Sequence, residues 1–496
     1  MRALGRWAGL AGGALYAWSL LVQCSSRKND CTDDDYRVAG LQCTADLADG
    51  GDGGPDASPD VVAPPGCDLT KSPKDSAACV DDSVGVFVAS SGDDGASGKK
   101  SAPVKSIAKG LEVAASSGLP RVYVCEGTYD AAAVVKVPIG LYGGLSCAWA
   151  YTGAKPKLAP PKGIALRVTK VTGPVVVEDF EIVGSADVNA PGDSAIAAFA
   201  SESKNVTFRN VTLFAGAGTG GATGSGASNY SAAAKPGVDS ANGGTAVTCA
   251  CLDGKTSSTG GKGGAIGADG DNGTATPAVG TPNFGFGGGI CNPGTNGVNG
   301  LAGASGKGAT RPGSLTNEGW SPSADGTTTS NGNPGQGGGG GGGRVGFAGG
   351  GGGACGGCGG AGGKPGGAGG SSFALLTFQS TVVVEGGTLT TSAGGSGGIG
   401  GTGQDGQAGG TPAGAGACNG GLGGNGAGGS GGGGGAGGHS VALGFVGTEP
   451  SVTGATLTQG AKGGAGGGGS PGAGPGNLGA AGTAGPEGKA QNSLAL

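Results

Sequence analysis

The chain has 496 residues, of which 126 are glycine, and a formal net charge of −5 at pH 7. Only 4% of the residues are aromatic and 13% are charged, so the chain cannot fill the several large cores that its length would allow. The single histidine, His439, excludes catalysis by a histidine pair and any metal site built from several histidines. The acidic balance gives no electrostatic footprint for nucleic acid, and we expect neither a nucleic-acid partner nor a cofactor.

Residues 1–23 have the pattern of a secretory signal peptide. Arg2 and Arg6 form a positive start, and residues 7–22 form an apolar stretch interrupted by glycine and serine. That stretch is too short and too rich in glycine for a transmembrane helix. The pattern predicts an exported protein.

The signal peptide ends at Leu-Val-Gln-Cys, residues 21–24, which resembles the lipobox of bacterial lipoproteins. Gln23 stands where that motif has a small residue. The resemblance implies that Cys24 is acylated and becomes the mature N-terminus. Ser25 after the cysteine then implies the outer membrane or cell surface, with a periplasmic or secreted location as the alternative.

The cysteine count supports export, because thirteen cysteines less Cys24 leave twelve that can pair in an oxidising compartment. Two pairs of close cysteines in glycine-rich sequence can also be interpreted as metal ligands. Without partner histidines, disulfides are the better interpretation, and no metal site is expected. The disulfide candidates are Cys31, Cys43, Cys67, Cys79, Cys125, Cys147, Cys249, Cys251, Cys291, Cys355, Cys358 and Cys418. The spacing of Cys125 and Cys147 favours a bridge between them.

A short strand at residues 86–88 is followed by a Gly/Asp loop at 90–98 and then by a helix that begins near Pro103. A second strand covers residues 121–125. The apolar face expected for the helix consists of Val104, Ile107, Ala108, Leu111 and Ala115.

The order of these elements, from residue 86 to 144, resembles the start of DUF1565-type, pectate-lyase-like right-handed parallel β-helices. The resemblance implies that the helix covers the open end of the first coil. Such a cover is physically reasonable because an open coil end exposes unpaired backbone groups.

Four short segments share one pattern, with apolar residues at both ends and Asp, Asn or Gly at the third position. Those third residues tolerate a left-handed backbone, which predicts a corner between two strands. The segments are 177–182, 208–213, 384–389 and 452–457. Their closing residues, Ile182, Leu213, Leu389 and Leu457, are the expected coil core.

Each segment follows a companion strand, which begins at Ile164, Ile196, Phe373 or Val441, at a nearly constant spacing. This regularity predicts one solenoid coil that recurs in register. The expected fold class is therefore all-β: a right-handed parallel β-helix with an N-terminal capping helix and long glycine-rich insertions.

The glycine-rich stretches resemble the PGRS type of Gly-Gly-x surface protein in composition. Because glycine loses much backbone freedom on ordering and offers no apolar surface, two outcomes stay open. The stretches are either flexible or packed as extended three-fold glycine helices that are hydrogen-bonded to their neighbours and held by disulfides.

The expected organisation runs from a signal peptide to a glycine-rich tail. Its parts are the signal peptide (1–23), a disordered acidic tether (24–66), a disulfide-containing segment with the capping helix (67–119), first coils (120–214), a glycine-rich insertion (215–370), a coil (371–394), a second insertion (395–438), a coil (439–460) and the tail (461–496).

An outward column of Glu178, Arg209, Glu385 and Thr453 is expected across the coils. Glu178 and its neighbour Asp179 point apart along a strand or corner, so they form no acid–base pair. Lys204, Asn205 and Asn210 form no recognised catalytic set. No catalytic residue is assigned, and enzymatic activity is not expected.

The sequence favours a lipid-anchored structural or adhesive surface protein that presents a glycine-rich face, with the membrane as one partner and glycans or extracellular matrix as candidate others. The alternative is a protein that binds or degrades polysaccharide. His439 is expected at the surface, and Trp149 and Tyr151 as core or as cover of a coil end.

Overall fold

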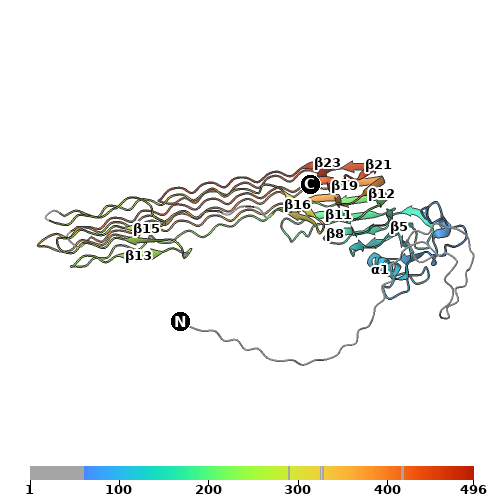
Figure 1. The fold of residues 1–496 in the computed structure, drawn as a ribbon, viewed down its shortest axis with the longest axis horizontal. Helices are drawn as coiled ribbons and strands as arrows, with labels where there is room; N and C mark the ends of the chain where they lie inside the picture. Colours follow the sequence, from blue (N-terminus) through green and yellow to red (C-terminus); the bar gives the residue numbers. More distant parts are fainter. Residues whose placement is uncertain (1–60, 289–290, 324–325, 327–328, 415–417) are drawn as a thin grey trace, which may run out of the picture. The chain divides into compact units, whose positions relative to one another are not determined.

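The computed structural model describes residues 61–496, apart from 289–290, 324–325, 327–328 and 415–417. The signal peptide, Cys24, Cys31, Cys43 and most of the tether lie outside the described residues. The described part is almost entirely β, and its two main sheets are built from strands that recur along the chain (Figure 1).

The larger sheet has twelve strands, nearly all in parallel pairs. They are β1 (Gly85–Val88), β2 (Arg121–Cys125), β3 (Thr128–Tyr129), β5 (Ile139–Leu145), β6 (Tyr151–Ala154), β7 (Lys157–Leu158), β9 (Val175–Glu178), β10 (Glu181–Gly184), β12 (Val206–Ala215), β19 (Val382–Thr391), β21 (Ser451–Thr453) and β22 (Thr456–Thr458).

The second sheet has six strands, all in parallel pairs. They are β4 (Ala133–Val135), β8 (Ile164–Thr169), β11 (Ala195–Ser201), β18 (Ser372–Phe378), β20 (Ser440–Val446) and β23 (Ala490–Ala495). Apolar side chains of both sheets meet in one buried cluster, so the parallel strands curl around a common core, an arrangement compatible with a β-helix.

The repeated segments pair in the register that the sequence pattern predicts. Ile182 lies opposite Leu213, Leu213 opposite Leu389, and Leu389 opposite Leu457. The first three are fully buried, and Leu457 packs against the same core while remaining partly exposed. The companion strands also pair in register. Ile196 of β11 lies opposite Ile164 of β8 on one side and opposite Phe373 of β18 on the other.

The predicted corners are confirmed by the backbone. Asp179, Asn210, Gly386 and Gly454 have φ of 58°, 49°, 68° and 67°. A second row of left-handed corners, which the sequence analysis missed, follows strands β8, β11, β18 and β20. It consists of Lys170, Glu202, Gln379 and Gly447, with φ of 56°, 49°, 48° and 96°.

The predicted helix exists as α1 (Ile107–Ser117), but it begins after Pro103 and its buried face differs from the expected one. Ser106 is the N-cap and accepts a hydrogen bond from the Lys109 amide at 3.1 Å. Ala108 and Ala115 are exposed, whereas Gly110 and Ala114 are buried at the i+3 and i+7 positions from Ile107. At Gly110 a Cβ would lie 2.4 Å from Val88 Cγ2, so glycine permits close packing.

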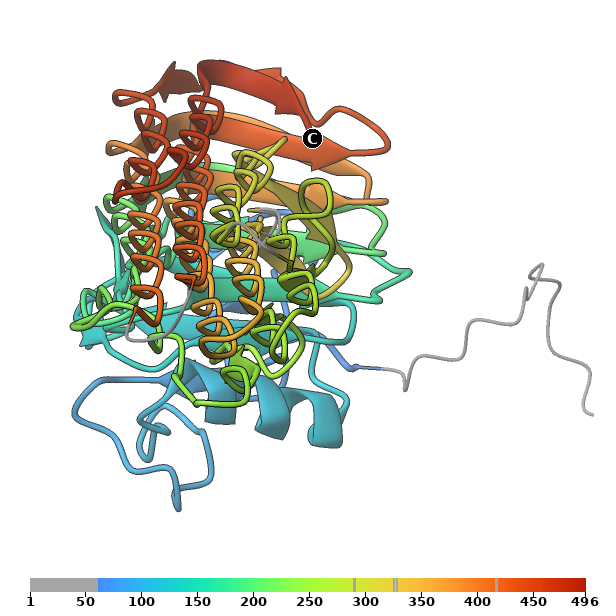
Figure 2. The ribbon, with the colours of Figure 1, turned by 90° about the vertical axis from the view of Figure 1, so that its left-hand side faces the viewer.

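Helix α1 packs against β1, β2 and β4 (Figure 2). It therefore covers the end of the two sheets that their earliest strands form. A short 3-10 helix, η1 (Ala77–Cys79), precedes β1. No helix among the described residues is long and apolar enough to cross a membrane.

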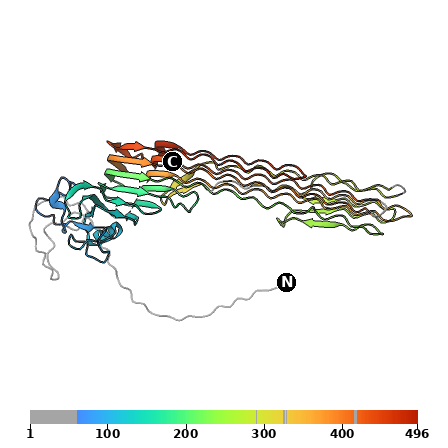
Figure 3. The same ribbon diagram turned by 180° about the vertical axis from the view of Figure 1, so that it is seen from behind.

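The glycine-rich segments leave the larger sheet after β12, β19 and β22 and return to the second sheet at β18, β20 and β23. They extend from one end of the sheets and run side by side (Figures 1 and 3). We call these segments the glycine array. It comprises residues 216–237, 292–309, 330–343, 349–370, 393–413, 420–438 and 460–488.

Peptide groups hold the glycine array together. The consecutive amides of residues 428, 429 and 430 donate to Asn477 O, Gln404 O and Ser330 O, which belong to three different segments. Three directions in three residues is the geometry of an extended helix with three residues per turn. The segments wind beside one another in rows (Figure 2). Of the two outcomes left open, the described residues adopt the packed one.

Five disulfides link described cysteines: Cys67–Cys79, Cys125–Cys147, Cys249–Cys355, Cys251–Cys358 and Cys291–Cys418. The predicted Cys125–Cys147 bridge is confirmed. The last three bridges join segments more than 100 residues apart within glycine-rich sequence. Among the described residues no group of three or more Cys, His, Asp or Glu side chains forms a metal site.

Two stretches assigned to glycine-rich sequence contain strands instead. The assignment of residues 461–496 to a tail is wrong at its end, because β23 pairs with β20 and Leu494 packs on Phe373 and Val441. The described residues of the region 215–370 contain five further strands, all paired antiparallel. They are β13 (Val247–Ala250), β14 (Ser257–Gly260), β15 (Thr274–Thr276), β16 (Gly313–Thr316) and β17 (Gly319–Pro322).

Candidate functional site

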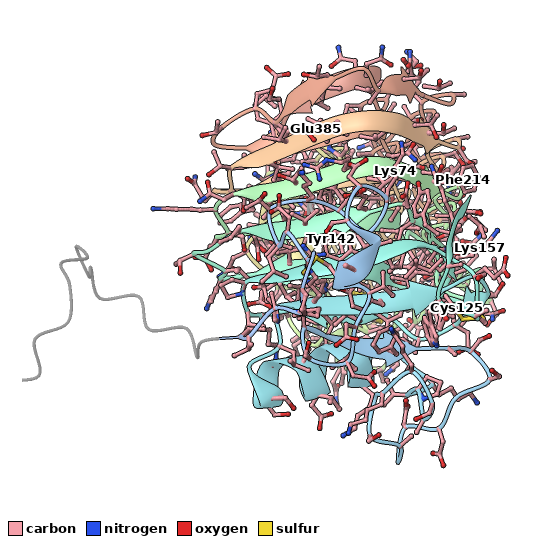
Figure 4. All side chains as sticks on the ribbon, turned by 90° about the vertical axis from the view of Figure 1, so that its right-hand side faces the viewer. Lys74, Cys125, Tyr142, Lys157, Phe214 and Glu385 are labelled. Carbon is pink, nitrogen blue, oxygen red and sulfur yellow. A yellow bond between two sulfur atoms is a disulfide. The ribbon has the colours of Figure 1, made fainter. Side chains whose placement is uncertain are left out.

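A column of side chains crosses the outward face of the larger sheet. Arg209 lies opposite Glu178 on one side and Glu385 on the other, and Glu385 lies opposite Thr453. This is the order that the sequence predicts. The column continues to Tyr142, opposite Glu178, which the sequence analysis missed. Figure 4 shows this face, with Tyr142 and Glu385 labelled.

Arg209 forms an ion pair with both carboxylates of the column. Its Nη1 lies 3.0 Å from Glu178 Oε2, and its Nε lies 2.8 Å from Glu385 Oε2. The side chain of Glu178 is only 7% exposed, whereas those of Arg209 and Glu385 are more than 40% exposed. Burial raises the pKa of Glu178 despite the favourable effect of Arg209. The hydrogen bond and the charge of Arg209 both lower the Glu178 pKa and so partly offset the effect of burial.

The neighbouring carboxylate, Asp179, points into a different environment. Its Oδ1 accepts a hydrogen bond from Asn210 Nδ2 at 2.5 Å, and its Oδ2 accepts one from the Tyr151 hydroxyl at 3.0 Å. Burial, followed by the hydrogen bond to Asp179, raises the pKa of Tyr151 to about 12. These bonds tie two left-handed corners to β6, which gives Asp179 and Asn210 a structural role.

The aromatic residues beside the column cover the sheet. Trp149 packs edge-on against Phe87, with ring centroids 4.6 Å apart, and belongs with Tyr151 to the cluster around Tyr123. This is the cover that the sequence predicts for both residues. Arg121 donates to the carbonyls of Leu69 and Lys71, so the segment preceding β1 also lies over this face.

General acid–base hydrolysis needs two carboxylic groups that converge on a substrate with different protonation states. In this column Glu178 and Glu385 both bind the same guanidinium, and Asp179 is occupied by Asn210 and Tyr151. Lys204 lies in the turn between β11 and β12, where its amide binds Val171 O. The arrangement is suited to holding adjacent strands together.

A second polar feature, which the sequence analysis missed, is an open groove of about 470 Å³ beside the second sheet. Arg167 projects from β8 and donates to Glu318 O at 2.9 Å, in the turn between β16 and β17. Its guanidinium also lies 5.5 Å from the ring centroid of Phe199. The groove is lined by Lys136, Arg167, Thr169, Lys170, Glu202, Asn317 and Glu318.

His439 is buried, which contradicts the surface position expected from its Gly and Ser neighbours. Only 4% of the residue is exposed, because the hairpin β16–β17 places Trp320 beside it. The centroids of the indole and imidazole rings are 5.5 Å apart. Its Nδ1 accepts a hydrogen bond from the Lys489 amide at 2.9 Å. Burial lowers the pKa of His439 to about 4.

His439 is expected to make stability depend on pH, and no other histidine contributes. Because its pKa falls from 6.5 in the unfolded chain to about 4 in the folded one, its contribution is complete above pH 6.5 and lost as the pH falls towards 4. Between pH 7 and pH 5 the free energy of unfolding should fall by about 2 kcal/mol from this group. Urea unfolding at both values measures the loss.

The control is His439→Asn, whose side-chain oxygen can still accept the Lys489 amide hydrogen bond but does not titrate. This variant should lose most of the difference between pH 7 and pH 5. An equal pH dependence in both proteins would show that His439 titrates normally.

Comparison with known proteins gives one match. Residues 90–148 match the family model described as "Protein of unknown function (DUF1565)". This part of the chain includes the loop after β1, helix α1, β2 and the Cys125–Cys147 disulfide, and it agrees with the resemblance drawn from the sequence. No curated protein matches the chain. No solved structure matches it either.

Proposed function

We propose that the chain is an exported, lipid-anchored surface protein in which a right-handed β-helix supports the glycine array as a structural and adhesive extension. Acylation of Cys24 would attach it to the outer membrane, and residues 25–66 would act as the tether. The glycine-rich segments are then insertions between successive β-helix coils. The five disulfides support an exported location, because such bonds persist in oxidising compartments.

The observation that carries this proposal is the close packing of the glycine array. Gly432 donates to Gly401 O, and a Cβ at Gly432 would lie 2.1 Å from Lys364 O. Similar contacts recur throughout residues 428–438. Where the glycines leave no room for a Cβ, the array is stiff, because hydrogen bonds to neighbouring segments fix its peptide groups. A stiff extension suits a protein that carries a contact surface away from its anchor.

Lipid attachment can be tested by labelling cells with radioactive palmitate. Wild-type protein should incorporate the label, and Cys24→Ser should not, while both are exported. Label in the Cys24→Ser variant, or none in the wild type, would contradict the proposed anchor.

The adhesive role requires a variant that damages the glycine array but not the sheets. Cells displaying Gly432→Val should attach less to glycan-coated or matrix-coated surfaces than wild-type cells. Gly467→Val is the matched control, since a Cβ at Gly467 meets nothing within 4 Å. Antibody staining of intact cells checks that all three proteins are displayed equally. Unchanged attachment by Gly432→Val at equal display would contradict the adhesive role.

The second candidate is polysaccharide binding, and the groove around Arg167 favours it. Lys136, Arg167 and Lys170 bring three cations to one groove against the carboxylates of Glu202 and Glu318. An acidic polysaccharide should therefore bind less tightly to Arg167→Gln than to the wild type, as measured by affinity electrophoresis. Equal retardation of both proteins would remove this candidate, and release of new reducing or unsaturated ends would show an enzyme instead.

A further inference from the structure

Four large apolar side chains stand exposed on three short segments of glycine-rich sequence. Ile266 is 52% exposed, Phe286 58%, Val345 61% and Phe347 69%. Exposed apolar groups that gather in one place mark contact surfaces more often than scattered ones do. We call residues 265–268, 286–288 and 344–348, which are two turns and a short extended stretch, the distal turns.

Hydrogen bonds place the distal turns next to one another. The amides of Gly267 and Gly288 both donate to Gly343 O, and the Val345 amide donates to Gly288 O. A Cβ at Gly267 would lie 3.0 Å from Val345 Cγ2. The backbone stretches that carry the four apolar side chains therefore lie side by side, although they come from parts of the chain about 80 residues apart.

The distal turns lie far from the sheets. Residues 349–370 run from the third turn to β18, and an extended three-residue helix rises about 3.1 Å per residue, so the separation is about 65 Å. The glycine-rich segments reverse direction at the end remote from the sheets (Figures 1 and 3). This surface therefore lies at the end of the proposed extension that is farthest from the sheets.

Two charged side chains, Asp269 and Arg344, lie in or directly beside the distal turns. Asp269 accepts a hydrogen bond from the Gly287 amide at 2.5 Å. The Arg344 guanidinium lies 4.0 Å from the ring centroid of Phe347, and no described carboxylate forms an ion pair with it. The surface thus combines apolar side chains with the Arg344 guanidinium, beside the exposed carboxylate of Asp269.

We infer that the distal turns bind a phospholipid bilayer surface. The inference rests on the proposed extension and names its contact surface and partner class. Ile266, Phe286, Val345 and Phe347 would enter the boundary between headgroups and acyl chains, while Arg344 binds lipid phosphate. The match between an available guanidinium and the lipid phosphates is the complementarity that favours this partner.

Two other partners fit less well. A saccharide needs several convergent polar side chains, and the exposed side chains of the four apolar residues supply none. A symmetric contact with a second copy would bring two Arg344 guanidinium groups into the same apolar interface, where like charges repel. Both remain distinguishable outcomes of the experiment.

The test is flotation of the mature chain, residues 24–496, with vesicles of phosphatidylethanolamine and phosphatidylglycerol. All proteins carry Cys24→Ser, so that no acyl chain contributes to binding. The double variant Phe286→Ser/Phe347→Ser should bind at least about tenfold less tightly than its parent, because two buried phenyl groups are lost. Ile399→Ser/Leu478→Ser is the matched control, since those residues are 56% and 63% exposed elsewhere in the glycine array. It should bind as the parent does.

A second readout does not depend on affinity. Phe347→Trp should show a blue shift of tryptophan emission when vesicles are added, whereas Leu478→Trp should not. Equal binding by the parent and both double variants would overturn the inference, as would no vesicle binding by the parent. Self-association that Phe286→Ser/Phe347→Ser abolishes, without vesicle binding, would overturn it in favour of a second copy. Because Cys24 is absent from every protein, a failure here is separate from a failure of palmitate labelling.

Discussion

Replacing Gly432 with alanine is expected to lower the free energy of unfolding by about 2–3 kcal/mol, whereas replacing Gly467 should raise it slightly. At Gly432 the new Cβ would lie 2.1 Å from Lys364 O, so neighbouring segments must separate and their hydrogen bonds lengthen. At Gly467 a Cβ meets nothing within 4 Å, and alanine restricts the unfolded chain by about 0.5 kcal/mol. Urea unfolding followed by circular dichroism measures both changes.

Gly466 provides an internal check on the same segment, one residue from the control. Its Cβ would lie 2.1 Å from Gly398 O, so Gly466→Ala should behave like Gly432→Ala and unlike Gly467→Ala. Similar stabilities for Gly466→Ala and Gly467→Ala would mean that the glycine array is not packed as described.

Replacing Arg209 with methionine is expected to destabilise the protein by about 2 kcal/mol. The variant leaves the Glu178 carboxylate nearly buried without its partner, and breaking a buried ion pair in this way is more damaging than losing an exposed one. Partial exposure of Arg209 keeps the effect below that of a fully buried pair. Denaturant midpoints at pH 7 measure the loss.

The double variant Glu178→Gln/Arg209→Met should recover most of that stability, because it removes the unpaired charge as well. Lys157→Met is the control for an exposed pair: Lys157 Nζ lies 2.8 Å from Glu181 Oε1, and both side chains are more than a third exposed. It should change stability by less than about 0.5 kcal/mol. Equally small losses of stability in Arg209→Met and Lys157→Met would contradict the prediction that the buried Glu178 carboxylate needs its partner.

The recurring strands could be predicted from the sequence because their constraints are local and repeated. Each corner needs a residue that tolerates positive φ, and Asp179, Asn210, Gly386 and Gly454 show this directly. The outward column from Glu178 to Thr453 follows from the same register. The second row of corners was not predictable in this way, because Lys170, Glu202 and Gln379 are not residues that favour a left-handed backbone.

What the sequence could not reveal depends on segments distant along the chain. His439 has only small neighbours in sequence, and its burial comes from Trp320 and the hairpin β16–β17. Strand β23 has a polar sequence, and its place is set by pairing with β20. The groove around Arg167 also depends on that hairpin. For α1, the buried face was predicted wrongly because glycine and alanine have too little apolar surface to mark it, and Gly110 and Ala114 are among the residues that it contains.

Hydrogen–deuterium exchange measured by mass spectrometry shows whether peptide hydrogen bonds hold the glycine-rich segments in place. Peptides covering residues 428–438 contain amides that donate to three different segments. We expect these peptides to remain largely protected after an hour at neutral pH and to exchange as slowly as peptides from β11 and β18. Complete exchange of residues 428–438 within seconds, while β11 and β18 stay protected, would contradict this expectation.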